Sequence, residues 1–355
     1  MKQFFLFLSF LLCVNIFATV RTVSNNPGTI AQYTTIQNAV NASISGDSIY
    51  VHGSPNQYTG FTITDKRLVV IGPGWSPMQS FMPYQATVLD ITINGSGSSN
   101  TEIQGLNIVS AVSITSASHP NNLRFLRNQL TSIIMGTGSV TYSGYVIEGN
   151  WFMNSGLNVA QGCFFTNFII RNNVFYSNSA NTSLFGFFNS VSVLIDHNLF
   201  YGPSNGSTNV FGGNCRGLLI TNNIFVRRNA AANNTNSVFR KNITYNAGVN
   251  NPWDAAYGNS GDSNFAAQSP QLFDSTAVNN GSNTLLLNFT IATGPANNSG
   301  TDGKDLGLLY DPVGSLNWTN SRMSRLPFVY SMNISNPNIP AGGTLNVQVE
   351  ARKNN

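Results

Sequence analysis

Two short stretches of the sequence carry the residue types that acid–base chemistry requires. Asp196 and His197 are adjacent, and Asp302 and Asp305 lie close together in a segment rich in glycine. Two carboxyl groups about 5–9 Å apart can act as the acid and the base of glycoside hydrolysis. Asp302 and Asp305 are therefore candidates for that pair, although Gly-Thr-Asp-Gly around Asp302 is also an ordinary turn sequence, and Asp196 and His197 are the other candidate catalytic residues.

Acidic residues are too scarce in the middle of the chain to favour a metal site. Between residues 101 and 250 they are only Glu102, Glu148 and Asp196. Calcium takes about six to eight oxygen ligands, several of them usually carboxylates. No HxH or HExxH spacing occurs either, so zinc is not expected. The pair Asp254 and Asp262 is one more carboxylate candidate, and we expect no metal and no cofactor.

A repeat must position these residues. An apolar residue, two variable residues, an asparagine, one residue and an apolar residue recur as FLRNQL, IEGNWF, IRNNVF, IDHNLF, ITNNIF and, more weakly, FRKNIT. The spacing of 19–25 residues predicts stacked units of a solenoid. Short runs of Ile, Val and Phe between Gly, Asn and Ser predict about three strands per coil, with coils ~4.8 Å apart. The repeated asparagines are Asn128, Asn150, Asn173, Asn198, Asn223 and Asn242.

Strand alternation assigns a direction to each position of the repeat. The first and last apolar residues should point into the core. The asparagine should occupy a corner in the left-handed conformation, which Asn tolerates, and its amide should bond the asparagines of neighbouring coils in a ladder. The repeated residues are therefore expected to serve the architecture.

The same alignment gives Asp196 and His197 structural interpretations. Two residues before the asparagine, Glu148, Arg171 and Asp196 should form a row of alternating charge, worth about 0.2–1 kcal/mol per pair. His197 occupies a corner slot that elsewhere holds varied residues. One residue after the asparagine, an outward row that includes Trp151 is mostly apolar. We expect residues 246–300 to cover that row, the alternative being an interface with a partner.

The repeat resembles that of the right-handed parallel β-helix family, which includes pectate lyases, polygalacturonases and phage tailspikes. Residues 46–74 resemble the opening coils, 34–43 the amphipathic helix that caps the first coil, and 300–312 a segment near the last coil. The resemblance implies an all-β fold, a right-handed parallel β-helix with an N-terminal capping helix and a C-terminal β element. Ile195-Asp196-His197-Asn198 is similar to a pectate lyase segment, and a lyase of that kind would use calcium and an arginine base.

The chain divides into three expected parts. Residues 1–18, with Lys2 before an apolar stretch and Ala18 at the end, resemble a signal peptide, so a secreted, cell-surface or periplasmic protein is expected. Residues 19–326 should form the β-helix, and 327–355 a β-strand cap or tail. Cys163 and Cys215 should lie two coils apart, too far for a disulfide, and remain buried free thiols.

The composition of the chain limits the classes of binding partner that are expected. Without Lys2, the 17 basic residues become 16 against 13 acidic ones, and no basic run is longer than Arg227–Arg228, so nucleic acid is not expected. No other apolar stretch is long enough to insert into a membrane. A surface of Asn, Ser, Thr and Gly suits a polysaccharide, and the oligomeric state stays open.

Three functions remain: a non-catalytic β-helix that binds polysaccharide or displays a surface, a polysaccharide lyase or glycoside hydrolase, and a structural or adhesive protein.

Overall fold

The structure is a computed structural model, and most of the chain is described. The described ranges are 18–76, 84–115, 118–136, 138–160, 162–177, 181–187, 190–203, 206–310, 318–321, 328–334 and 341–352. Residues 1–17, which hold most of the expected signal peptide, lie outside them. No helix in these ranges is long and apolar enough to cross a bilayer.

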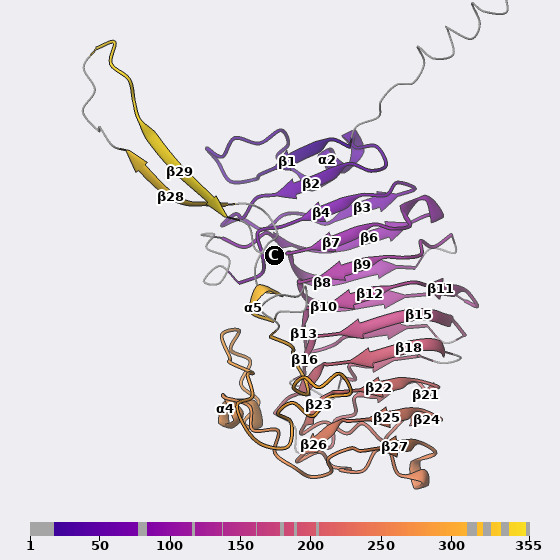
Figure 1. Cartoon of the computed structure of the whole chain (residues 1–355). Helices are drawn as coiled ribbons and strands as arrows, with labels where there is room; N and C mark the ends of the chain where they lie inside the picture. The colour runs from indigo at the N-terminus through magenta and orange to yellow at the C-terminus, as the bar shows by residue number, and fades with distance from the viewer. Residues whose placement is uncertain are drawn as a thin grey trace, which may run out of the picture.

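One parallel sheet runs the length of the solenoid, with one strand from each coil (Figure 1). We call it sheet A. Its strands, in spatial order, are β1 (Val20–Val23), β2 (Ser48–Val51), β4 (Val69–Ile71), β7 (Glu102–Gln104), β9 (Arg124–Leu126), β12 (Val146–Glu148), β15 (Phe164–Arg171), β18 (Ser190–Asp196), β22 (Leu219–Thr221), β25 (Val238–Arg240) and β27 (Ser260–Asp262). β11 (Thr141–Ser143) pairs with the start of β15.

A second parallel sheet, sheet B, forms the other walls. Its early strands are β3 (Phe61–Thr64), β5 (Thr87–Val88), β6 (Ile91–Asn94), β8 (Asn107–Ile114) and β10 (Gln129–Met135). At β10 the sheet divides, since the two halves of this strand pair with different strands of the next coil. One branch is β13 (Trp151–Met153), β16 (Val174–Tyr176), β19 (Leu199–Tyr201), β23 (Ile224–Val226) and β26 (Ile243–Tyr245). The other is β14 (Leu157–Val159), β17 (Leu184–Phe185) and β20 (Phe211–Gly212).

These sheets confirm the expected right-handed parallel β-helix. The helix α2 (Ile36–Ala42) buries Ile36, Ala39 and Val40 against the first coil, as predicted, and Thr35 caps its N-terminus. At the other end of the solenoid, Trp253 packs against Phe239, with ring centroids 6.2 Å apart. The smaller elements are η1 (Ser96–Ser98), β21 (Cys215–Arg216), β24 (Asn234–Thr235), η2 (Ala255–Tyr257), α4 (Ser275–Asn279) and α5 (Trp318–Ser321).

Stacked aromatic rings fill the interior. Phe152, Phe175, Phe200 and Phe225 are fully buried, and successive rings are parallel with centroids 4.6–5.1 Å apart. The last apolar residue of each repeat therefore points inward, as the pattern predicts. Cys163 and Cys215 are also buried, and both are free thiols.

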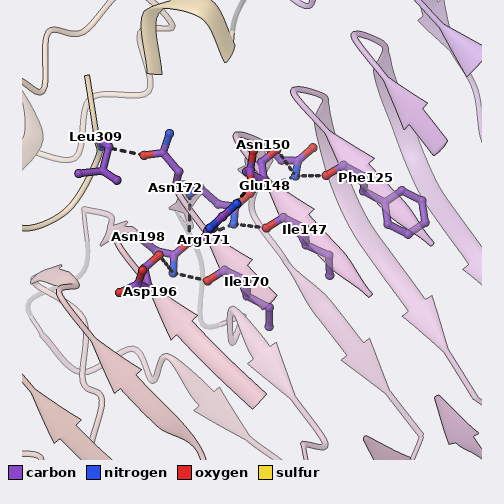
Figure 2. Close-up of polar contacts among 11 residues, drawn as sticks. Phe125, Ile147, Glu148, Asn150, Ile170, Arg171, Asn172, Asp196, Asn198 and Leu309 are labelled. Atoms are coloured by element: carbon purple, nitrogen blue, oxygen red, sulfur yellow. Dashed lines mark hydrogen bonds and ion pairs between the residues drawn. The ribbon is translucent and has the colours of Figure 1, made fainter. Parts of the chain in front are cut away.

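The repeated asparagines are buried and hydrogen-bonded from coil to coil. Asn198 donates from Nδ2 to Asn223 Oδ1 at 2.9 Å and to Ile170 O at 2.8 Å, while its Oδ1 accepts from Asn173. Figure 2 shows the equivalent bonds of Asn150 and Asn198 to the carbonyls of neighbouring coils. Asn264, which the sequence pattern missed, extends the column by one coil, because its Oδ1 accepts from Asn242 at 3.0 Å.

The left-handed residue of each corner is not the asparagine, contrary to expectation. It is the residue before it: Arg127, Gly149, Asn172, His197, Asn222 and Lys241, with φ between 51° and 68°. The asparagine side chain thus bonds the stacked backbone, while its predecessor turns the chain. That corner slot accepts several residue types because its backbone conformation is the main requirement.

A second apolar core lies outside sheet B. After the last coil, residues 265–310 and α5 run back along the solenoid, and we call this segment the C-terminal arm (Figure 1). Leu272, Phe289 and Trp318 of the arm pack with Trp151 and its row. The predicted cover by residues 246–300 is therefore present through Leu272, Phe289 and their neighbours, and Leu306, Leu308 and Trp318 extend it beyond residue 300.

The C-terminal β element is an antiparallel hairpin of β28 (Phe328–Ile334) and β29 (Val347–Arg352). Figure 1 shows it beside the N-terminal coils, whereas the last coil lies at the opposite end of the solenoid. Trp253, and not this hairpin, closes the core at that end. The domain boundaries at residues 18 and 326 stay predictions.

Candidate functional site

The C-terminal arm docks on the corner residues of the solenoid, which are the residues that precede the repeated asparagines. The backbone N–H of Leu309 donates to Asn172 Oδ1 at 2.7 Å, as Figure 2 shows. Asn222 exchanges two bonds with Thr301, since its Oδ1 accepts from the Thr301 N–H at 2.8 Å and its Nδ2 donates to Thr301 Oγ1 at 2.9 Å. The Gly307 N–H donates to Asn222 O at 2.7 Å. Residues 300–309 thus form hydrogen bonds with side chains at a corner position where the sequence pattern indicated no specific role.

The structure brings two candidate catalytic residues, His197 and Asp302, together at this contact. His197 Nδ1 donates to Gly307 O at 3.0 Å, because a carbonyl oxygen can only accept. His197 Nε2 lies 3.5 Å from Asp302 Oδ2, an ion pair only when the imidazole is protonated. The imidazole is 2% exposed, so the arm covers it from solvent. This contact attaches the arm and offers no open surface for a substrate.

Asp196 and Asp305 have separate partners. Asp196 Oδ1 accepts from Thr221 Oγ1 at 2.6 Å and from Asn222 Nδ2 at 2.8 Å. Asp305 accepts from the backbone N–H of Asn298 at 2.8 Å and lines a hollow of about 290 Å³ in the arm. It is the one acidic residue among the described residues that line that hollow.

The expected charged row forms in part. Arg171 Nε lies 2.7 Å from Glu148 Oε2, and the two residues are paired across β12 and β15. Asp196 is the next residue of the same row, but its described partners are Thr221 and Asn222. The pair Glu148–Arg171 therefore holds neighbouring coils together, while Asp196 supports the corner that binds the arm.

The remaining acidic candidates also serve local structure. Asp254 Oδ1 accepts from Ala256 N at 2.8 Å and so caps η2. Asp262 lies in the last strand of sheet A and accepts from Ser263 Oγ. Across the described ranges, no three His, Cys, Asp or Glu residues are grouped so that they could hold a metal ion.

A groove of different character lies over β14 and β17. It has a volume of about 160 Å³, and no ionisable side chain is among the described residues that line it: Ser155, Leu157, Asn158, Asn181, Thr182 and Phe185. Asn158 is exposed and Phe185 half-buried on adjacent strands, where they are paired residues. We call this the neutral groove. Its lining therefore combines hydroxyl and amide groups with one aromatic ring.

Glycines of the next coil set the position of the Phe185 ring. A Cβ atom added to Gly212 would lie 2.7 Å from Phe185 Cδ2, and one added to Gly213 would lie 2.9 Å from Cε1. The ring therefore rests directly on glycine backbone, where any side chain would displace it. Sequence alignment of the repeats gave no signal for this groove, because its residues lie between the repeated motifs.

Arg228 supports the wall of the neutral groove from beneath. Its Nη2 donates to the carbonyls of Asn181 and Asn209, at 3.0 and 2.9 Å, and to Ser183 Oγ at 3.3 Å. The side chain is fully buried, and burial lowers the pKa of Arg228 to about 10. One guanidinium group thus joins the loop at Asn181 to the following coil.

A second groove, of about 300 Å³, is charged. It lies at the start of the sheet A strands and is lined by Arg67, Val69, Asn100, Glu102, Asn122, Arg124, Gly144 and Val146. Arg124 Nε and Glu102 Oε2 are paired at 3.1 Å, and Arg67 is exposed. We call this the charged groove, and it provides a natural contrast to the neutral groove.

No protein-family model and no curated protein matches the sequence. Among solved structures, "Geobacillus virus E2 - ORF18" is similar at 13% identity and a TM-score of 0.29, over 64% of this chain. The chain spans 53% of the length of that viral structure. Pectate lyase Pel9A is similar at 14% identity and a TM-score of 0.30, over 82% of this chain and 96% of the lyase. The fold of the protein is a parallel β-helix, which its own strand order and register define.

Proposed function

We propose that this protein is a non-catalytic β-helix protein that binds an uncharged polysaccharide in the neutral groove. The observation that carries the proposal is the lining of that groove, where hydroxyl and amide groups surround the Phe185 ring and no described lining residue is ionisable. A sugar ring offers an apolar face to an aromatic side chain and hydroxyl groups to amides. Such a site needs no charge to bind its ligand.

The placement of the acidic candidates supports binding rather than catalysis. Asp196 bonds Thr221 and Asn222, and Asp302 faces the covered imidazole of His197. A glycosidase needs two carboxyl groups that flank an open cleft about 5–9 Å apart. The grooves with described linings hold at most one acid each, which is Glu102 in the charged groove and Asp305 in the hollow of the arm. The expected export signal suits a protein that meets polysaccharides outside the cell.

Calorimetric titration with neutral and uronic-acid oligosaccharides tests the proposal. We expect a neutral oligosaccharide to bind, and Phe185→Ala to weaken binding about tenfold, since loss of an aromatic contact costs about 1 kcal/mol or more. Asn158→Arg, at an exposed position, should block the groove without affecting the fold. Arg67→Ala in the charged groove is the matched control and should bind normally.

Two results would overturn this function. Binding of acidic oligosaccharides alone, with loss on Arg67→Ala, would assign the ligand to the charged groove. Release of new reducing ends or of unsaturated products from any polysaccharide would show that the protein is a hydrolase or a lyase.

A further inference from the structure

A buried carboxylate stands beside the nitrogen of Thr19. The side chain of Asp47 is 0% exposed, and it precedes β2. Its Oδ1 accepts from the Thr19 backbone nitrogen at 2.8 Å, and its Oδ2 accepts from Arg21 Nε and from Ile44 N, both at 3.1 Å. Burial alone would raise the pKa of Asp47, but the bonds from Thr19, Ile44 and Arg21 outweigh it and lower the pKa.

The backbone around Thr19 is fixed on its other side as well. The Ser48 N–H donates to Thr19 O at 2.9 Å, and Val20 is in register with Ser48 in the first pair of sheet A. The Thr19 nitrogen is therefore directed at Asp47 by the same pairing that starts the solenoid. Ala18, the residue before it, and Thr19 itself are exposed.

The sequence places the end of the expected signal peptide between these two residues. Hydrolysis of this bond adds one water, so that Ala18 leaves with a carboxylate and Thr19 keeps the nitrogen as an ammonium group. An amide with one N–H and no charge thereby becomes a cation with three N–H donors. Charge-assisted bonds of this kind are shorter and about twice as strong as neutral ones.

We propose that cleavage between Ala18 and Thr19 creates a salt bridge from the new α-ammonium group to Asp47, which locks β1 onto the first coil. The inference goes beyond glycan binding and does not depend on it. Asp47 then holds two cations, the N-terminus and Arg21; its own carboxylate is 0% exposed, while Thr19 lies at the surface. Removal of the leader would thus complete the N-terminal end of the solenoid.

The first test uses the exported protein. The full chain, expressed with export, should yield Thr19 as the N-terminal residue by mass spectrometry. Its α-amino group should react with an acylating reagent at pH 7 about tenfold more slowly than that of the Asp47→Asn variant, since one pKa unit of stabilisation lowers the free amine tenfold. Another N-terminal residue, or equal acylation rates, would overturn the proposal.

The main comparison of the second test does not depend on the Asp47 variant, since it uses two chains with the native Asp47. A chain that begins at Thr19 keeps every described residue except Ala18, and it is compared with a chain that begins at Ala18. The Thr19 chain should melt about 2 °C higher. Asp47→Asn should remove that difference, while Asp262→Asn, an exposed carboxylate at the other end of sheet A, should keep it. Equal melting of the two parent chains would contradict the salt bridge.

Discussion

Two outward rows of apolar residues run along this solenoid, and only one of them is buried. The row on sheet B includes Trp151, Val174, Leu199 and Ile224, all 0% exposed beneath the C-terminal arm. The row on sheet A is in register over five coils as Val146, Ile169, Leu194, Leu219 and Val238. Its members are half-buried or exposed, and Leu219 is 38% exposed.

The difference shows that two outward apolar positions of the same repeat can serve different purposes. Both rows are made by alternation along parallel strands, and both carry apolar side chains. Among the described residues, the arm packs on the sheet B row, where Gly307 lies so close to Ile224 that an added Cβ would be 2.5 Å from Ile224 Cδ1. An outward apolar row therefore forms part of a second hydrophobic core when another segment of the chain packs over it.

The largest expected effect is that of alkaline pH on the covered face. Tyr201 Oη donates to Ser282 O at 2.9 Å and Tyr176 Oη to Gly281 O at 3.2 Å, so both hold the arm. Burial raises the pKa of Tyr201 and of Tyr176. Stability is therefore fully present below about pH 10, where unfolded tyrosine is neutral, and is lost as the pH rises further, by at most about 1.4 kcal/mol per pH unit for each tyrosine that stays neutral in the fold.

Denaturant unfolding at pH 8, 10 and 11 measures this loss. The pKa of Tyr58, Tyr142 and Tyr145 is also raised, chiefly by burial, so the inner core adds to the effect. Arg228 has the opposite effect on stability. Burial lowers its pKa to about 10, so the protein gains stability from this group as the pH rises, but it is a single residue against several tyrosines. Tyr201→Phe should reduce the pH dependence, while Tyr257→Phe, at an exposed site, should not. Equal free energies of unfolding at pH 8 and pH 11 would contradict the expected loss of stability at alkaline pH.

The second expected effect compares two leucines of the two rows. Leu199→Ala should lower the free energy of unfolding by about 3 kcal/mol, because it leaves a cavity under the arm. Leu219→Ala should stay within about 0.5 kcal/mol, since this side chain already meets water. Equal losses in chemical denaturation would mean that the sheet A row is also covered.

The third effect compares two corner asparagines. Asn222 and Asn236 both have positive φ, of 59° and 53°, so the backbone strain caused by alanine is similar. Asn222 also bonds Thr301 and Asp196, whereas Asn236 is exposed. Asn222→Ala should therefore cost about 1–2 kcal/mol more than Asn236→Ala, because buried partners lose their bonds. Thermal unfolding of the two variants would show no difference if the arm did not rest on this corner.

The smallest effect concerns the charges beside the uncovered row. A double-mutant cycle with Glu148→Gln and Arg171→Met should give a coupling of about 0.2–1 kcal/mol, since the pair is partly exposed. The same cycle with Asp196→Asn in place of Glu148→Gln should give less, because Asp196 bonds Thr221 and Asn222. A larger coupling of Arg171 to Asp196 than to Glu148 would contradict the assignment of Glu148 as its main partner.

Much of the fold followed from the sequence, whereas the sites did not. The period and the apolar positions predicted the coils, and the aromatic stack of Phe152 to Phe225 lies as expected. The corner was displaced by one residue, because the asparagine bonds its neighbours while His197 or Asn222 turns the chain. The neutral groove was missed, since Asn158 and Phe185 lie outside the repeated motif.

Local sequence specifies the coil, because each coil buries one set of apolar residues and one corner amide, and this pattern repeats along the chain. Long-range packing sets which outer surfaces stay open. The contacts of His197 with Gly307 and of Asn172 with Leu309 join residues 110 and 137 positions apart. No local period encodes where the arm returns, since that depends on the shape of the whole outer face against which it packs.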